Sequence, residues 1–182
     1  MRRYWFPKPY ADLVARLRVP SGFLLAALFA WLAQPTRGSL AAGLPVSVVG
    51  LLIRTWAAGH LAKNQELATT GPYGYVRNPL YAGTLIAAAG LVMAAREMWL
   101  AVIFAAVFLL VYLPVIEQEE QHLRNLFPSY EAYATRVPLL VPRGKPAASG
   151  RFRLDLYLRN REYQALLGFL AGAAFLIWKA SV

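Results

Sequence analysis

Residues 79–116 read PLYAGTLIAAAGLVMAAREMWLAVIFAAVFLLVYLPVI, two long apolar runs separated only by Arg96 and Glu97. A helix that crosses a bilayer needs about 20 consecutive apolar residues, and each run approaches that length. Pro79 suits the first turn of a helix, where its missing N–H would have no partner. The stretch therefore predicts a hairpin of two membrane helices, over residues 79–95 and 98–116.

Three further apolar runs lie outside this stretch, at residues 20–33, 39–58 and 165–178. Arg54 is close enough to the end of the second run for its side chain to snorkel toward water. Apolar residues make up 58% of the chain and charged residues 15%, and their segregation into runs indicates a bilayer rather than a water-soluble core. The sequence predicts an all-α integral membrane protein, a single domain over residues 1–182 with about five transmembrane helices.

The first 18 residues mix basic and aromatic side chains, among them Arg2, Arg3 and Trp5. This mixture predicts an amphipathic segment at the membrane surface. The net charge of +10 does not indicate a nucleic-acid partner, because the basic residues flank the apolar runs instead of forming one compact patch. The expected partners are the lipid bilayer and a small or lipophilic molecule.

The distribution of positive charge predicts the orientation in the membrane, because cytoplasmic loops carry an excess of Lys and Arg. With five spans and a cytoplasmic N-terminus, the polar segments 59–78 and 117–163 also face the cytoplasm. Sixteen of the nineteen Lys and Arg residues then lie on the cytoplasmic side, and the other three are Arg37, Arg96 and Lys179.

The chain has no cysteine, which excludes disulfides, zinc–thiolate sites and a cysteine nucleophile. Its two histidines, His60 and His122, have no spacing typical of metal ligands. No metal site is predicted, and the chemistry is expected to rely on carboxylates, amides, tyrosines, arginines and a bound cofactor.

The polar segment before the hairpin, residues 63–83, reads KNQELATTGPYGYVRNPLYAG and concentrates amide, hydroxyl, aromatic and basic groups. Gly71, Pro72 and Gly74 supply turn chemistry and allow close approach of the backbone. The segment is typical either of a ligand-binding loop or of a tyrosine-rich interfacial belt.

A second cluster, Glu117 to Glu120, brings three carboxylates to the end of the run 98–116. Carboxylates so close to a bilayer are costly unless they face water or a cation. The cluster therefore indicates either a solvated helix end or the site of a cationic ligand. Because the hairpin returns the chain, Tyr81 and Glu120 are expected near the same membrane face.

Together these residues resemble the isoprenylcysteine carboxyl methyltransferase family and the related phospholipid N-methyltransferases, over about residues 50–142. The resemblance is carried by the motif RNPLYAG at 77–83, by the pair Glu119-Glu120, and by a tail ending in Arg136-Val137-Pro138. The other positions of that tail are Leu123, Phe127, Tyr130 and Tyr133.

The resemblance implies a membrane-embedded methyltransferase with an S-adenosylmethionine pocket on the cytoplasmic side. The residues it implies for cofactor binding are Lys63, Leu67, Gly71, Tyr73, Asn78, Tyr81, Glu119, Glu120 and Tyr133. The residues it implies for catalysis are Arg77, Tyr81 and Arg136. The two glutamates are expected to take the ammonium group and the ribose hydroxyls of the cofactor, and which takes which stays open.

Two departures from the family pattern matter. Asn78 stands where the family usually has histidine, so this position can hydrogen-bond but cannot transfer a proton. The extension after about residue 145, with its probable extra span, has no counterpart and is expected to serve in anchoring or oligomer contacts. The sequence carries no signal for the oligomeric state.

The methyl acceptor is open at this stage: a lipophilic or small carboxylate, amine or thiol fits the resemblance. Two alternatives are an NADPH-binding protein similar to sterol reductases and a non-catalytic membrane scaffold. Sterol-type reductases need about twice as many spans, and the intact Tyr81 and Glu119-Glu120 disfavour a degenerate scaffold.

Overall fold

The computed structural model describes residues 5–142 and 150–181, which form helices and connecting loops without a β-strand. The all-α prediction is therefore confirmed for these residues. Arg2 and Arg3, and the start of the C-terminal extension at 145–149, lie outside the described residues. The α-helices are α1 (Lys8–Leu32), α2 (Arg37–Ala58), α3 (Pro79–Ala95), α4 (Met98–Val107), α5 (Leu113–Leu126), α6 (Tyr130–Arg136), α7 (Leu154–Arg159) and α8 (Tyr163–Lys179), with a 3₁₀ turn η1 (Gly71–Gly74) and a π-helical segment η2 (Phe108–Tyr112).

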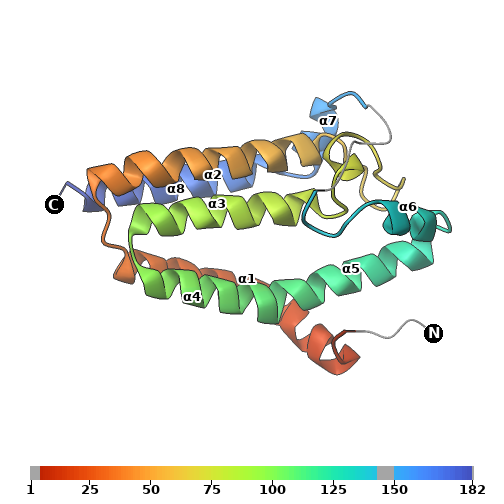
Figure 1. Ribbon diagram of the computed structural model, residues 1–182, viewed down its shortest axis with the longest axis horizontal. Helices are drawn as coiled ribbons and strands as arrows, with labels where there is room; N and C mark the ends of the chain where they lie inside the picture. Colours follow the sequence, from red (N-terminus) through yellow and green to blue (C-terminus); the bar gives the residue numbers. More distant parts are fainter. Residues whose placement is uncertain (1–4, 143–149, 182) are drawn as a thin grey trace.

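The helices form an elongated bundle in which α2, α3 and α8 run side by side and α1 lies against α4 (Figure 1). The expected hairpin is present, since α3 begins at Pro79 and α4 starts at Met98, just after α3 ends. Arg96 makes the turn in the left-handed conformation, with φ of 55°. Its backbone N–H bonds to the carbonyls of Val92 and Met93, which closes the last turn of α3.

The second arm of the hairpin is one continuous helix of 29 residues, from Met98 to Leu126. Within it, η2 widens the turn, and the Leu113 N–H bonds to the Phe108 carbonyl five residues earlier. Pro114 has no N–H to offer the Leu110 carbonyl four residues before it. The Tyr10 hydroxyl donates to that carbonyl at 2.6 Å, so α1 satisfies the group that proline leaves exposed.

Two described helices, α2 and Met98–Leu126, are long and apolar enough to cross a bilayer. A third span results if the two halves of α1, which meet at a bend of 52°, count as one. The apolar helices α3 and α8 have 17 residues each, about 25 Å, which is slightly short of a hydrocarbon core of roughly 30 Å. An integral membrane protein is indicated, and all five apolar runs of the sequence are helical.

The backbones of α2 and α3 touch along a line of small residues. A Cβ atom added to Gly50 would overlap backbone atoms of Gly83 and Ala87, and one added to Gly43 would overlap those of Gly90 and Ala94. Small residues at such positions let membrane helices approach closely and gain dispersion contacts along their length. This contact fixes the position of α3 relative to α2.

The polar segments gather at one end of the bundle. The loop 59–78, α6 and α7 lie there together with the end of α5, whereas the C-terminus and the turn between α3 and α4 lie at the other end (Figure 1). That other end is closed by an apolar cluster that includes Ala33, Ala95 and Leu176. Any polar site of the described residues must therefore be sought at the loop end.

The close contact between α2 and α3 predicts that Gly50→Ala destabilises the protein. Its methyl group meets backbone atoms that cannot move aside, and overpacking of this kind costs about 1–3 kcal/mol. Gly168→Ala on α8 is the matched control, because nothing lies within 4 Å of its added Cβ and alanine favours a helix. Thermal unfolding in detergent should show a lower Tm for Gly50→Ala alone, and equal Tm values would contradict the packing described.

Candidate functional site

A pocket of about 810 Å³ opens at the loop end of the bundle, between the loop 59–78, the head of α3 and the helix η2–α5. Exposed polar side chains surround its mouth, and buried tyrosines form its base. Its lining consists of Arg54, Leu61, Lys63, Asn64, Glu66, Leu67, Ala68, Tyr73, Arg77, Leu80, Tyr81, Thr84, Tyr112, Val115, Gln118, Glu119, His122, Leu123, Tyr130 and Tyr133.

Tyr81 joins the two arms of the hairpin across this pocket. Its hydroxyl donates to Glu119 Oε1 at 3.0 Å, and its ring meets the Tyr112 ring edge-on, with centroids 6.1 Å apart. Tyr81 lies in the first turn of α3, and Glu119 lies in the part of α5 that faces it. The hairpin was expected to bring Tyr81 and Glu120 near the same membrane face, and the structure places the start of α3 and the segment Glu119–Glu120 together at the loop end of the bundle.

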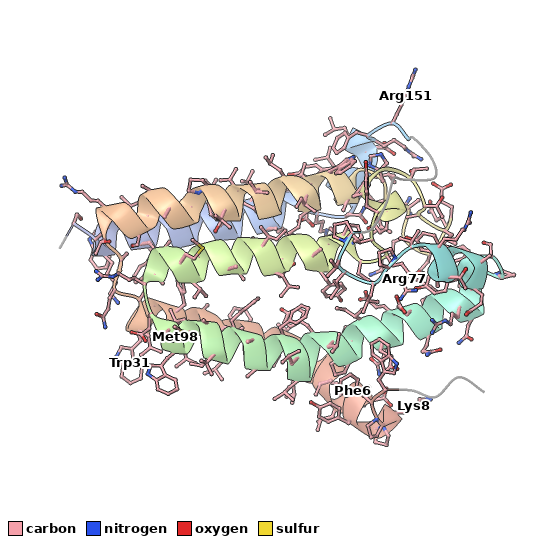
Figure 2. The ribbon with its side chains drawn as sticks, in the orientation of Figure 1. Phe6, Lys8, Trp31, Arg77, Met98 and Arg151 are labelled. Atoms are coloured by element: carbon pink, nitrogen blue, oxygen red, sulfur yellow. The ribbon has the colours of Figure 1, made fainter. Side chains whose placement is uncertain are left out.

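Arg77 and Glu120 form a buried ion pair beneath the pocket. Arg77 Nε lies 2.9 Å from Glu120 Oε1, and the Asn78 amide donates to the same oxygen at 3.4 Å. Arg77 also donates to the Ala134 carbonyl at 2.8 Å, which ties the head of α3 to α6. Figure 2 shows Arg77 at the loop end, far from Trp31 and Met98 at the other end.

The tyrosines at the base are held as neutral phenols. The Tyr133 hydroxyl donates to the Tyr73 carbonyl at 2.8 Å and so fastens α6 to η1. Desolvation by burial raises the pKa of Tyr73, Tyr130 and Tyr133 above the ordinary value for tyrosine. They can donate hydrogen bonds and present ring faces, but they cannot serve as phenolate bases at physiological pH.

Arg54 points into the bundle, so the expectation that it snorkels toward water is wrong. Its guanidinium pairs with Glu162 through Nε at 2.6 Å and Nη2 at 3.0 Å. Its remaining terminal nitrogen donates to the Leu80 carbonyl at 3.2 Å and to the Thr84 hydroxyl. Inside a bundle, these partners satisfy a charge that apolar neighbours would not tolerate.

The acidic cluster of α5 separates into three directions, because the helix continues through it. Glu117 is buried and accepts the backbone N–H groups of Trp5 at 2.6 Å and Phe6 at 3.1 Å, so it holds the N-terminal segment. Glu119 faces the pocket, and Glu120 lies behind the lining with Arg77. A cationic ligand therefore does not meet all three carboxylates.

The structure places seven of the eleven predicted site residues in the pocket lining: Lys63, Leu67, Tyr73, Arg77, Tyr81, Glu119 and Tyr133. Glu120 lies just behind it and pairs with Arg77, and the Asn78 amide donates to Glu120. Gly71 is at a positive φ of 58° with its Cα against the His60 ring, which leaves no room for a side chain. Arg136 does not line the pocket, and its Nε donates to Ala132 within its own helix at 3.1 Å.

Several lining residues were not among the predicted ones, and Arg54, Thr84 and Tyr112 are the chief examples. They lie inside apolar runs, where polar side chains at membrane depth are themselves a signal of function. His122 and Asn64 also meet at the mouth, with His122 Nε2 3.3 Å from Asn64 Oδ1. Over residues 5–142 and 150–181, no three His, Asp or Glu side chains are placed to hold a metal ion.

The charges around the pocket favour a cationic ligand. The lining contributes three fixed cations, Arg54, Lys63 and Arg77, and two carboxylates, Glu66 and Glu119, a net charge of +1. The buried carboxylates paired with two of these cations, Glu162 and Glu120, change the net charge to −1. Glu120 also lies 3.7 Å from Arg124, which pairs in turn with Glu131, and this further cation and carboxylate cancel and leave the balance unchanged.

Comparisons with known proteins give a consistent picture. The model of the phospholipid methyltransferase family matches residues 40–130, half of the chain. The nickel-cobalt-cadmium resistance protein NccN of Alcaligenes xylosoxydans xylosoxydans is 38% identical over 103 residues, 56% of this chain and 47% of that protein. The cobalt-zinc-cadmium resistance protein CzcN of Cupriavidus metallidurans is 35% identical over 103 residues, 56% of this chain and 46% of that protein.

The protein-S-isoprenylcysteine O-methyltransferase of Schizosaccharomyces pombe is 30% identical over 141 residues, which cover 74% of this chain and 59% of that enzyme. The chain thus spans about half the length of the curated relatives it matches. No solved structure matches the chain.

The Arg77–Glu120 pair predicts a large loss of stability in Glu120→Gln. Removing one partner of a buried ion pair leaves an uncompensated charge and costs about 3–5 kcal/mol. Glu131→Gln is the matched control, because Glu131 is 43% exposed and its pair with Arg124 contributes at most about 1 kcal/mol. Thermal unfolding in detergent should show a Tm for Glu120→Gln well below that of the control, and similar Tm values would be evidence against a structural ion pair.

Proposed function

Because the chain belongs to the phospholipid methyltransferase family, we propose that it is a membrane-embedded methyltransferase that uses S-adenosylmethionine. The observation that carries the proposal is the pocket that Tyr81 and Glu119 bridge, whose lining together with the buried carboxylates paired to it has a net charge of −1. The acceptor is a lipophilic or small molecule that offers a carboxylate, amine or thiol.

The residues of the pocket fit this cofactor. A volume of about 810 Å³ lies within the roughly 300–1,000 Å³ of small-molecule sites. S-adenosylmethionine carries a sulfonium cation, an ammonium group and a carboxylate. The net negative charge suits the two cations, the tyrosine ring faces can attract a sulfonium, and Lys63 at the mouth can bind the carboxylate. NADPH, with its several phosphate charges, suits this pocket less well.

Each predicted residue has a proposed role that its position allows. Glu119 accepts the ammonium group or the ribose hydroxyls together with Tyr81, and Leu67 and Tyr73 pack against the adenosine. Tyr133 closes the base of the pocket. Asn78, Glu120 and Gly71 support the lining from behind, and Arg77 orients an anionic acceptor in preference to Arg136.

When bound, the cofactor would supply a reactive methyl group, which would pass in line to the acceptor as its bond to the sulfonium sulfur breaks and the sulfur leaves as a neutral thioether. The chain supplies alignment and exclusion of water, because holding two reactants in attack geometry removes much of the entropic barrier. Cation–π attraction by the tyrosines is worth about 0.5–2 kcal/mol. The phenols at the base are neutral, so a carboxylate acceptor fits best with no base, and an amine would have to arrive deprotonated.

The proposal includes five membrane spans, with α3 and α8 crossing in locally thinned lipid. The N-terminus and the pocket then face the cytoplasm, where the excess of Lys and Arg at the loop end is expected. The loop end contains the segments 59–78 and 150–161, and of the basic residues that the structure describes only Arg37, Arg96 and Lys179 lie at the other end.

A lipophilic acceptor is proposed to enter sideways from the bilayer. A shallow groove of about 400 Å³ between α1 and η2 is lined by Val19, Gly22, Phe23, Ala26 and Tyr112. Tyr112 lines the main pocket as well, so the groove and the pocket share this side chain. The π-helical turn that carries it is a form often found at functional sites.

The first test is calorimetric binding of S-adenosylmethionine to the protein in detergent. Micromolar binding is expected for the native chain, and a loss of about tenfold or more for the double variant Tyr81→Phe and Glu119→Gln. Glu97→Gln at the far end of the bundle is the control and should bind like the native protein. A folded native protein that does not bind S-adenosylmethionine would refute the proposed function.

The groove predicts a separate effect on the acceptor. Ala26→Trp fills the groove and should raise the KM for a total membrane lipid extract severalfold, measured by transfer of labelled methyl groups. The Kd for S-adenosylmethionine should not change. Leu24→Trp, on the same helix but outside the groove lining, is the control, and equal KM values for both variants would rule out this entry route.

A further inference from the structure

The C-terminal extension packs directly against the wall of the pocket. The Arg153 N–H donates to the Gly59 carbonyl at 2.9 Å, and the Asn160 amide donates to the carbonyls of Ala58 and Leu61 at 3.0 and 2.9 Å. The extension therefore caps the end of α2, where the chain enters the loop that lines the pocket. This region lies beyond residues 40–130, which the family model matches.

Glu162 is the residue of the extension that pairs with a charged side chain of the pocket lining. It immediately precedes α8, is 8% exposed, and binds Arg54 through both carboxylate oxygens. Arg54 in turn contacts the Leu80 carbonyl and the Thr84 hydroxyl on α3. A chain of contacts thus runs from the extension through Arg54 to the helix that carries Tyr81.

Glu162 also supplies one of the negative charges around the pocket, and the same count of fixed charges without it gives a net value of 0. With it, the fixed charges of the lining and of the carboxylates paired to them have a net value of −1. Without it, Arg54 is an uncompensated cation in the pocket wall, where the low dielectric constant strengthens its repulsion of any positive ligand. A neutral ligand of the same shape would feel this change far less.

We infer that Glu162 is a positioning and charge-balancing residue of the methyl-donor pocket, supplied by the C-terminal extension. It holds Arg54 against α3 and neutralises it, so that a cofactor with a sulfonium charge is accepted. The inference rests on the proposed function. It distinguishes S-adenosylmethionine from S-adenosylhomocysteine, which has the same adenosine and amino-acid parts but an uncharged thioether.

The test compares calorimetric Kd values of both compounds at pH 8 for the native protein and for Glu162→Gln. The variant should bind S-adenosylmethionine about tenfold more weakly, which corresponds to about 1.4 kcal/mol. Its Kd for S-adenosylhomocysteine should change less than about threefold. Asp155→Asn, which breaks the exposed pair with Arg153 in the same extension, is the control and should leave both Kd values unchanged.

Two further variants separate charge from structure. Arg54→Gln leaves Glu162 without its cation, so it should strengthen binding of S-adenosylmethionine relative to S-adenosylhomocysteine. This variant tests the inference even if Glu162→Gln does not fold. In the double variant Arg54→Gln and Glu162→Gln both charges of the pair are removed, so the ratio of the Kd for S-adenosylmethionine to that for S-adenosylhomocysteine should return to the native value. If every variant raised the Kd values of both ligands equally, Glu162 would have only a structural role and the inference would be overturned. A native protein that binds neither ligand would instead overturn the proposed function on which the inference rests.

Discussion

The contact between the backbones of α2 and α3 is the constraint on which the rest of the site depends. Gly43 and Gly50 of α2 lie against small residues of α3, so the two backbones touch. This contact places Arg54 of α2 against the first turns of α3. With larger residues, Arg54 could not reach the Leu80 carbonyl. Tyr81, one residue further along, would then lose its fixed position opposite Glu119.

From this contact the structure builds a polar site at the end of an apolar bundle by pairing charges across elements. Arg77 with Glu120 joins the loop before α3 to α5, and Arg54 with Glu162 joins α2 to the start of α8. Each pair takes one member from the pocket lining and one from behind it. The lining can therefore present polar groups while both of its arginines are paired, and the two pairs also hold the helices together at the end of the bundle that carries the polar loops.

Much of the fold could be predicted from the sequence, because apolar runs in a bilayer are constrained to be helices and Pro79 marks a helix start. The hairpin alone predicted that Tyr81 and Glu120 lie near the same end of the molecule, but not that the Tyr81 hydroxyl donates to the neighbouring Glu119. The partner of Arg54 could not be predicted, because Glu162 is 108 residues away and no local pattern connects them. The separate directions of Glu117, Glu119 and Glu120 also could not be predicted without knowing that the helix continues to Leu126.

The π-helical turn at Phe108–Tyr112 determines how the side chains of α5 are oriented around the helix axis. A π-turn holds one residue more than an α-turn, and each residue of an α-helix turns by about 100°. Everything beyond the turn is therefore rotated by that amount relative to a regular helix of the same sequence. Which glutamate looks into the pocket and which is buried behind it depends on this single additional residue. Gaining or losing one residue at this turn would therefore rotate the glutamates of α5 about the helix axis, while α4 before the turn would keep its packing against its neighbours.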